Sequence, residues 1–212
     1  MEIAIIGAGN VGRALATSST RAGHAVTVSA AHPDHAADVA REAGARAVGS
    51  NRSAVENAEV VVLAVPSPAL DEVVADLGDA LDGKVVVDPT NRVSPDDPVA
   101  TLDGSSNAER LQARLPRARV VKAFNVAFAS RQAEPVVDEV AVDGLVAGDD
   151  PDAKRQVLEL VRSIGFRPID AGPLGMARAL EAMAVLNIML QIWNGWPWEA
   201  GWKLVGPTGS AG

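Results

Sequence analysis

The sequence predicts an α/β protein with a Rossmann-type, doubly wound and mainly parallel sheet, completed by a small C-terminal α/β lobe. Two observations carry this prediction. Short runs rich in valine and isoleucine alternate with helical segments along most of the chain, an order typical of parallel sheets covered by helices on both faces. The first run leads through a glycine-rich turn into a helix, which is how a βαβ unit begins.

The predicted elements follow one another as strand and helix in turn. Residues 2–6 (EIAII) form the first strand, and an alanine-rich helix after the glycine turn ends at Ala22-Gly23. The run EVVVLAV at 59–65 is almost wholly apolar, which is typical of a strand buried on both faces, and KVVVD at 84–88 is similar. The remaining strands are expected at 25–30, 46–48, 118–123, 142–147 and 166–170, and the remaining helices at 34–43, 52–58, 69–81, 106–115, 151–164 and 176–193.

The composition excludes several classes of site and partner. The 212 residues include no cysteine, which rules out disulfides, thiolate metal sites and a cysteine nucleophile. The three histidines all lie near the N-terminus, so we expect no metal site. A net charge of −8 makes nucleic acid and anionic membranes poor partners. Without a signal peptide or an apolar run of about 20 residues, the sequence predicts a cytoplasmic protein with no membrane contact.

The glycine turn, GAGNVG at residues 7–12, matches the G-x-G-x-x-G pattern of dinucleotide-binding folds. In that pattern Gly7 permits the tight turn, Gly9 lets the backbone approach a pyrophosphate, and Gly12 lets the helix pack closely on the strand. The helix that contains Asn10 and Val11 offers unpaired N–H groups and a positive dipole end to the phosphates. We therefore interpret the turn as a dinucleotide site, with an ordinary glycine-rich turn as the alternative.

The end of the second strand bears on the choice between NADP and NAD. An acidic residue there would bind the ribose 2′-hydroxyl and repel a 2′-phosphate, and the segment VSAAH at 28–32 contains none. Ser29 and His32 could donate hydrogen bonds to a phosphate. No arginine stands there as a clamp, and Asp34 would oppose a phosphate. The sequence favours NADP and leaves NAD possible, and a solvated loop histidine is the alternative for His32.

Two further turns follow buried strands. Ala64, Val65 and Pro66 end one strand, and Pro89 and Asn91 follow the next. In an open parallel sheet, ligands bind beyond the carboxyl ends of the strands. We expect these residues to line the ribose and nicotinamide half of the cofactor site, with a turn-stabilising role as the alternative for Asn91.

These elements suggest a division of the chain. We expect a dinucleotide-binding Rossmann domain at 1–123 and a smaller lobe at 124–205 that completes the cleft. The segment 206–212, rich in Gly, Ser and Pro, is expected to be a flexible tail, and 89–104 is expected to be a loop.

With these pieces in order, the sequence resembles the coenzyme F-420-dependent NADP oxidoreductases over nearly its whole length. The resemblance rests on EIAIIGAGNVG, VVVLAVP and KVVVDPTN, and more specifically on VVKAFNVAFA at 120–129, RPIDAGPLGMARALEAMA at 167–184 and LNIMLQIWNG at 186–195. It implies a Rossmann domain and a small C-terminal lobe with a deazaflavin between them. A membrane ferric-reductase family carries a similar domain with the KAFN stretch, feeding a flavin.

The resemblance also implies a chemistry. A hydride would pass directly between the nicotinamide C4 and C5 of the 5-deazaflavin, which requires two stacked rings in a dry cleft and no obligatory acid or base. The implied cofactor site includes Ala123 and Asn125, and the stretch Asn125, Val126, Ala127 and Phe128 would position the nicotinamide and the deazaflavin. Residues 172–174 (GPL) would lie beside the same pocket, and 194–195 (NG) near its rim.

Two features outside these motifs have open interpretations. Lys122 could meet a phosphate or carboxylate of the second substrate, or could extend to solvent from a strand end. All four tryptophans fall between residues 193 and 202. The four are Trp193, Trp196, Trp198 and Trp202. They could wall the deazaflavin pocket, or form a packed C-terminal hook or a dimer interface. We expect the protein to be a homodimer.

Three functions remain in competition. The first is hydride transfer between NADP(H) and coenzyme F-420, favoured because the glycine turn, the KAFN stretch and the GPLGMAR stretch occur together. The second is an NAD(P)H-dependent reductase of a flavin or of a small imine or ketone, for which Lys122 is the candidate proton donor. The third is a non-catalytic redox sensor that binds NADP(H) and signals through the tryptophan-rich surface.

Overall fold

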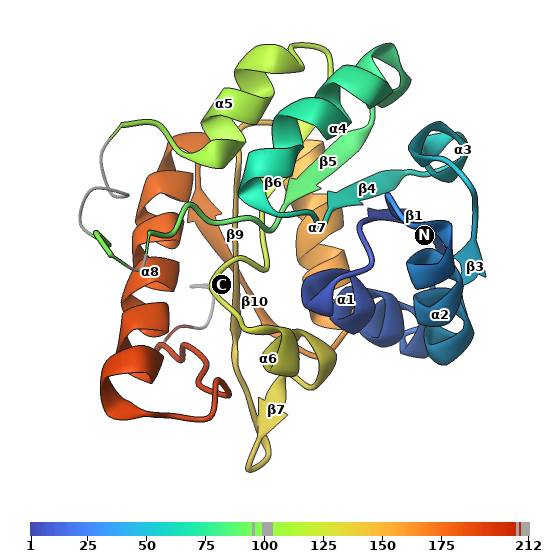
Figure 1. The fold of residues 1–212 in the computed structure, drawn as a ribbon. Coiled ribbons are helices and arrows are strands. Elements are labelled where there is room, and N and C mark those ends of the chain that lie inside the picture. The colour runs from blue at the N-terminus through green and yellow to red at the C-terminus, as the bar shows by residue number, and fades with distance from the viewer. Residues whose placement is uncertain (95, 99–103, 207, 209–212) are drawn as a thin grey trace.

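An eight-stranded sheet forms the centre of the computed structural model, which describes residues 1–94, 96–98, 104–206 and 208 (Figure 1). The strand order is β10-β9-β6-β5-β4-β1-β2-β3. Neighbours are parallel except β6 and β9, which pair antiparallel. The predicted Rossmann-type, mainly parallel sheet is confirmed. The strands are β1 (Glu2–Ile6), β2 (Ala25–Ser29), β3 (Arg46–Ala47), β4 (Val60–Leu63), β5 (Val85–Asp88), β6 (Arg119–Lys122), β9 (Asp143–Gly148) and β10 (Arg167–Gly172).

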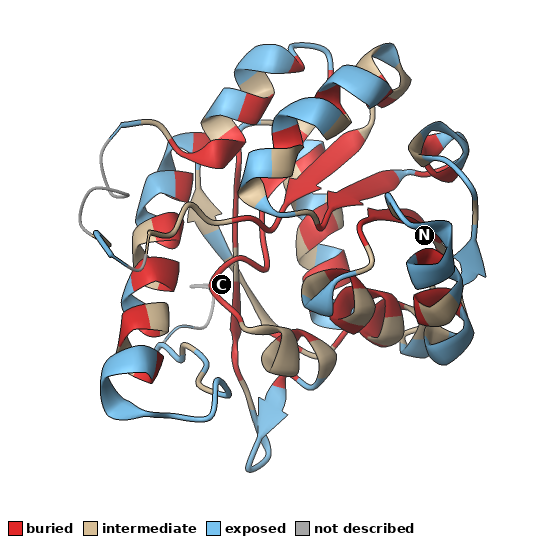
Figure 2. Ribbon diagram, viewed as in Figure 1, coloured by how far each residue is buried: buried red, intermediate tan, exposed pale blue. Residues whose placement is uncertain are grey.

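Helices cover both faces of this sheet (Figure 1). Side chains alternate along each strand, so Ile3 and Ile5 pack in the core beneath α1, α2 and α7, whereas Ala4 and Ile6 pack beneath α3, α4 and α5. Because the central strands are covered on both faces, they consist of continuous apolar runs, and Figure 2 shows them buried. The helices are α1 (Asn10–Arg21), α2 (Pro33–Ala43), α3 (Asn51–Val55), α4 (Leu70–Leu77), α5 (Asn107–Arg114), α6 (Ala129–Ala133), α7 (Pro151–Ser163) and α8 (Ala177–Asn194), with 3-10 turns η1 (Ser67–Ala69), η2 (Gly78–Leu81) and η4 (Leu174–Met176).

The segment after β6 contains elements that the sequence analysis did not predict. These are the short helix α6 and a hairpin of β7 (Val136–Val137) and β8 (Val140–Ala141) that projects from the body of the protein (Figure 1). Because β9 pairs with β6, residues 124–205 extend the sheet that 1–123 begins, and the domain boundary at 123 stays a prediction. The loop predicted at 89–104 and the tail predicted at 206–212 lie partly outside the described residues.

The long helix α8 differs from the expectation about apolar runs. Residues 174–194, counted from the 3-10 turn that precedes the helix, have the length of a membrane span, and an 18-residue window within them has a mean hydropathy of 1.2. In that window 44% of the residues are buried inside the protein. The statement that no run approaches the length of a span was therefore wrong by length and composition, although a core helix of a soluble protein meets the same two criteria.

Candidate functional site

The glycine turn between β1 and α1 is tightly packed against neighbouring backbone. Gly7 has φ +115°, and a Cβ added there would lie 2.2 Å from the carbonyl oxygen of Ala64. A Cβ at Gly12 would lie 2.0 Å from the carbonyl oxygen of Gly7, so α1 can pack this closely on β1 only with glycine at that position. At Gly9 no atom lies within 4 Å of an added Cβ. The turn is therefore closed on the protein side and open where a ligand would approach.

The N-terminus of α1 faces the same open space. Gly9 is the N-cap, no side chain caps the helix, and no acidic residue lies in its first turn. The N–H groups of the first turn, which include those of Asn10 and Val11, are therefore left for a ligand, together with the positive end of the helix dipole. This arrangement fits a pyrophosphate.

A cavity of about 780 Å³ opens beside the turn and is here called the larger cavity. It brings together the carboxyl ends of β1, β2 and β4 and one face of α4. Six of the predicted site residues line it, namely Gly7, Gly9, His32, Ala64, Val65 and Pro66. The other lining residues are Ile6, Ala8, Ala30, Ala31, His35, Asn51, Ala69, Glu72, Val73 and Asp76.

The polar end of the larger cavity contains residues that the sequence analysis missed. The rings of His32 and His35 lie edge to face with centroids 5.2 Å apart. Ser29 is fully buried and lies behind Asn51: its hydroxyl donates to Asn51 Oδ1 at 2.8 Å, and Asn51 Nδ2 donates to Asp76 Oδ2 at 2.9 Å. Ser29 can thus act on a ligand only through Asn51. The one signal for His35 in the sequence was its position three residues after His32, on the same side of a helix start.

A second cavity, of about 250 Å³, adjoins the first and is here called the smaller cavity. The two meet at the consecutive residues Gly9 and Asn10. The lining side chains of the smaller cavity are apolar or carry amides, and none of them is titratable. They are Asn10, Val11, Pro89, Asn91, Asn125, Val126, Ala127, Phe128, Ala129, Gln132, Ala184, Asn187 and Ile188.

Two asparagines, Asn91 and Asn125, are hydrogen-bonded to each other at the edge of the smaller cavity. Asn91 Nδ2 donates to the carbonyl oxygen of Asn125 at 2.8 Å, and Asn125 Nδ2 donates to Asn91 Oδ1 at 2.9 Å. Phe124 precedes this pair with φ +67°, an uncommon conformation for a bulky residue, and its carbonyl accepts from Gln132 Nε2 at 3.1 Å. The buried oxygens Asn125 Oδ1 and Gln132 Oε1 accept no hydrogen bond from the described part of the chain. A carboxamide N–H donor such as that of nicotinamide would complete them.

Lys122 reaches neither solvent nor a cavity, so both expectations for it were wrong. Its side chain is 0% exposed, and Nζ donates to Asp88 Oδ2 at 2.9 Å, to Glu181 Oε1 at 2.8 Å and to the carbonyl oxygen of Thr90. Asp88 Oδ1 in turn accepts from the Thr90 backbone N–H at 2.9 Å and from its hydroxyl at 2.6 Å. This cluster fixes the turn that presents Asn91 and ties α8 to the sheet.

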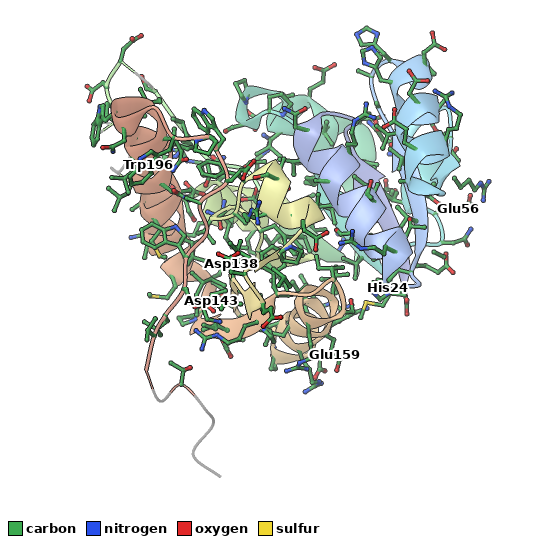
Figure 3. The ribbon with its side chains drawn as sticks, turned by 90° about the horizontal axis from the view of Figure 1, so that it is seen from below. His24, Glu56, Asp138, Asp143, Glu159 and Trp196 are labelled. Carbon is green, nitrogen blue, oxygen red and sulfur yellow. The ribbon has the colours of Figure 1, made fainter. Side chains whose placement is uncertain are left out.

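The tryptophans form a hook behind the smaller cavity and line neither cavity. The Trp198 ring lies edge-on to Phe128, a lining residue, at 5.3 Å between centroids. Trp202 packs against the small core around α8, and its carbonyl accepts from the Asp143 N–H. Trp193 and Trp196 are exposed, and Figure 3 shows Trp196 on the outer side of the molecule beside the end of α8. Trp198 is also 44% exposed, so of the four tryptophans Trp202 is the one packed against a core cluster, and the dimer interface stays a prediction.

Three other predicted positions do not line either cavity. Ala123 is fully buried in the core below the turn. Residues 172–174 end β10 and begin η4, with Leu174 in the core beneath α4 and α5, and residues 194–195 end α8. Across the described ranges, no group of three or more His, Asp or Glu residues could hold a metal ion.

Comparisons with known proteins place this arrangement in a family. The family model described as NADP oxidoreductase coenzyme F420-dependent matches residues 2–92. The F420-dependent NADP reductase of Methanothermobacter marburgensis is 32% identical over 212 residues, which cover 92% of this chain and 94% of that protein. This chain belongs to the F420-dependent NADP oxidoreductase family. The predicted family and the predicted class of enzyme, an NAD(P)-dependent oxidoreductase, are therefore confirmed.

Two further proteins are similar to this chain over most of its length. A crystal structure from Arthrobacter sp. FB24, described as an F420-dependent NADP reductase, superposes with a TM-score of 0.84 at 26% identity and covers 97% of this chain and 100% of that one. The metalloreductase STEAP3 of Rattus norvegicus is 35% identical over 183 residues, which cover 86% of this chain and 36% of that protein. This member of the F420-dependent family thus spans about a third of that relative.

Proposed function

We propose that this chain transfers a hydride between NADP(H) and the 5-deazaflavin coenzyme F-420. The observation that carries the proposal is the lining of the smaller cavity, where the described side chains are apolar or amides and none can titrate. Passage of a hydride between two stacked rings requires placement and exclusion of water, with no acid or base at the reacting carbons. When both are bound, nicotinamide C4 and deazaflavin C5 exchange the hydride, and water supplies the proton that deazaflavin reduction takes up.

The residues present fit a dinucleotide that lies across both cavities. The open space at Gly9 and the free N–H groups of α1 would hold the pyrophosphate. Pro66 and Pro89 would back the ribose and nicotinamide beyond the ends of β4 and β5. The buried oxygens of Asn125 and Gln132 would accept from the nicotinamide carboxamide. The deazaflavin would then lie between the nicotinamide and α8.

NADP is the proposed partner dinucleotide, with NAD as the possible alternative. No acidic residue ends β2, and His32 and His35 line the cavity at the start of α2. Two acids, Glu72 and Asp76, line the same cavity from α4. The proposal places the 2′-phosphate on the histidine side, because the ring N–H of a histidine can donate a hydrogen bond to a phosphate.

The position of Lys122 bears on the two alternative reductase functions, reduction of an imine or ketone and reduction of a flavin. An imine or ketone reductase needs a proton donor at the reacting atom, and Lys122 is enclosed by Asp88 and Glu181 instead of facing substrate. Reduction of a flavin needs no such donor and is the second candidate, supported by the similarity to a metalloreductase over most of this chain.

The test is an anaerobic mixture of the purified protein, reduced coenzyme F-420 and NADP⁺, followed by the visible absorbance of the deazaflavin, with NAD⁺ in parallel. A rise in absorbance with NADP⁺ supports the proposal, and a faster rise with NAD⁺ would reverse the nucleotide preference. Nucleotide binding without turnover of the deazaflavin, alongside reduction of FMN by NADPH, would favour the flavin reductase. Binding with no turnover of either would favour the redox sensor.

We also propose a homodimer that works in the cytoplasm without a membrane or nucleic-acid partner. Support for an interface comes from large apolar side chains exposed on and after α8, among them Leu186, Ile192, Trp193 and Trp196. Apolar and aromatic side chains are enriched in the cores of homodimer interfaces. Sedimentation equilibrium of the wild-type chain and of Trp193→Ser tests the proposal, which predicts a dimer that the substitution weakens. A monomer at all concentrations would contradict it.

A further inference from the structure

A basic cavity of about 290 Å³ lies between α4 and α5, which run side by side on one face of the sheet (Figure 1). It is separate from the larger and smaller cavities. Three arginines line it, Arg92, Arg110 and Arg114, with Asp71 as the one lining carboxylate. In a chain with a net charge of −8, this concentration of cations runs against the overall composition and attracts anions.

The three guanidinium groups differ in how far they are already paired. Arg114 forms an ion pair with Asp71. The Arg92 side chain is 21% exposed, and its Nε lies 3.6 Å from Glu181 Oε2. Arg110 donates to one serine hydroxyl at 3.3 Å, and no carboxylate of the described residues forms an ion pair with it. Arg110 therefore keeps most of its donors for a ligand.

Neutral donors complete the cavity and connect it to the cofactor cleft. Asn107 Nδ2 donates to Ser67 Oγ at 2.8 Å, so the Ser67 hydroxyl retains its own proton for another acceptor. Ser67 directly follows Pro66 of the larger cavity, and Arg92 directly follows Asn91 of the smaller one. The basic cavity thus borders the cleft at the ends of both β4 and β5.

We propose that this cavity binds an anionic group, a phosphate or a carboxylate, which is either part of the second substrate or free in solution. Guanidinium groups bind both kinds of anion through paired N–H donors and keep their charge at any physiological pH. Assignment to the second substrate rests on the proposed function, because coenzyme F-420 carries a phosphodiester and glutamate carboxylates on its side chain. The existence of the site does not depend on that function.

The first arm of the test is calorimetric titration with inorganic phosphate at constant ionic strength. NADP⁺ is kept saturating, so that the phosphate positions at the glycine turn are filled. We expect binding by the wild-type chain and by Arg155→Ala, a control at an exposed arginine of α7. Arg110→Ala should bind phosphate about tenfold more weakly, because it loses a charge-assisted hydrogen bond.

The second arm compares KM for coenzyme F-420 with KM for the same deazaflavin truncated at its ribityl chain, which has no phosphate. An increase of about tenfold for F-420 alone in Arg110→Ala assigns the site to the second substrate. Loss of phosphate binding with an unchanged KM assigns it to a free anion. If Arg110→Ala alters neither phosphate affinity nor KM, the proposal is overturned. If the wild-type chain does not turn over F-420, the proposed function fails and the phosphate arm alone decides the site.

Discussion

Replacing Lys122 by methionine removes the ammonium group that joins Asp88 to Glu181 inside the protein. Breaking a buried ion pair costs about 3–5 kcal/mol, because a charge is left uncompensated. Asp88 keeps its two hydrogen bonds from Thr90, and Glu181 keeps Arg92 at 3.6 Å, so we expect a loss within that range and not twice as large. Against a total stability of about 5–15 kcal/mol, the loss should lower Tm by about 6–20 °C for a chain of this size.

Equilibrium urea unfolding followed by tryptophan fluorescence measures this loss. The control is Arg41→Met, because Arg41 pairs at 2.7 Å with Asp38 and the two side chains are 71% and 50% exposed, and an exposed pair contributes about 1 kcal/mol or less. A loss for Lys122→Met that is no larger than that of the control would refute the reasoning. If Lys122→Met does not fold, Glu181→Gln removes one charge of the same cluster and allows the same comparison.

Three further predictions concern the glycine turn, acid stability and nucleotide choice. Gly9→Ala should keep Tm within about 2 °C yet weaken NADP⁺ binding in calorimetry, because only a ligand would meet the added Cβ. Gly12→Ala should lower Tm instead, because its Cβ would lie 2.0 Å from a backbone oxygen. Equal Tm values for the two variants would contradict this. The hydrogen bond from Arg178 lowers the pKa of Glu109 from 4.5 to about 2, so this carboxylate contributes stability above pH 4.5 that is lost as pH falls toward 2. Glu109→Gln should flatten acid unfolding in that window, and an unchanged acid profile would count against the pairing. His35→Ala should weaken NADP⁺ binding about threefold or more while sparing NAD⁺, and equal losses for both nucleotides would argue against the 2′-phosphate position.

The central strands and the glycine turn could be predicted because their signals are local. A strand covered on both faces needs a continuous apolar run, and VVVL at 60–63, which is buried at every position, is such a run. The glycine pattern depends on neighbouring backbone, since a Cβ at residue 12 would clash with the carbonyl oxygen of Gly7. Both signals lie within a few residues, so the sequence alone was sufficient.

The rest of the site depends on contacts between distant parts of the chain. Lys122 meets Asp88 and Glu181, which are 34 and 59 residues away, and nothing near Lys122 in the sequence indicates that both approach it. Gln132 stands in a short helix, and its side-chain amide donates to the carbonyl oxygen of Phe124, a residue with left-handed backbone. The antiparallel pairing of β9 with β6 was equally hidden, because an apolar strand reads the same in either direction.

The most direct test of the central claim, passage of a hydride between the two ring systems, follows the transferred hydrogen itself. The protein is mixed anaerobically with coenzyme F-420 and NADPH that is stereospecifically deuterated at nicotinamide C4, and the reduced deazaflavin is analysed by mass spectrometry after one turnover. The account predicts that one of the two C4 diastereomers delivers its deuterium to C5 of the deazaflavin, at a slower rate than NADPH. Reduced deazaflavin that carries solvent hydrogen at C5 with either diastereomer would contradict it, as would the absence of reduction.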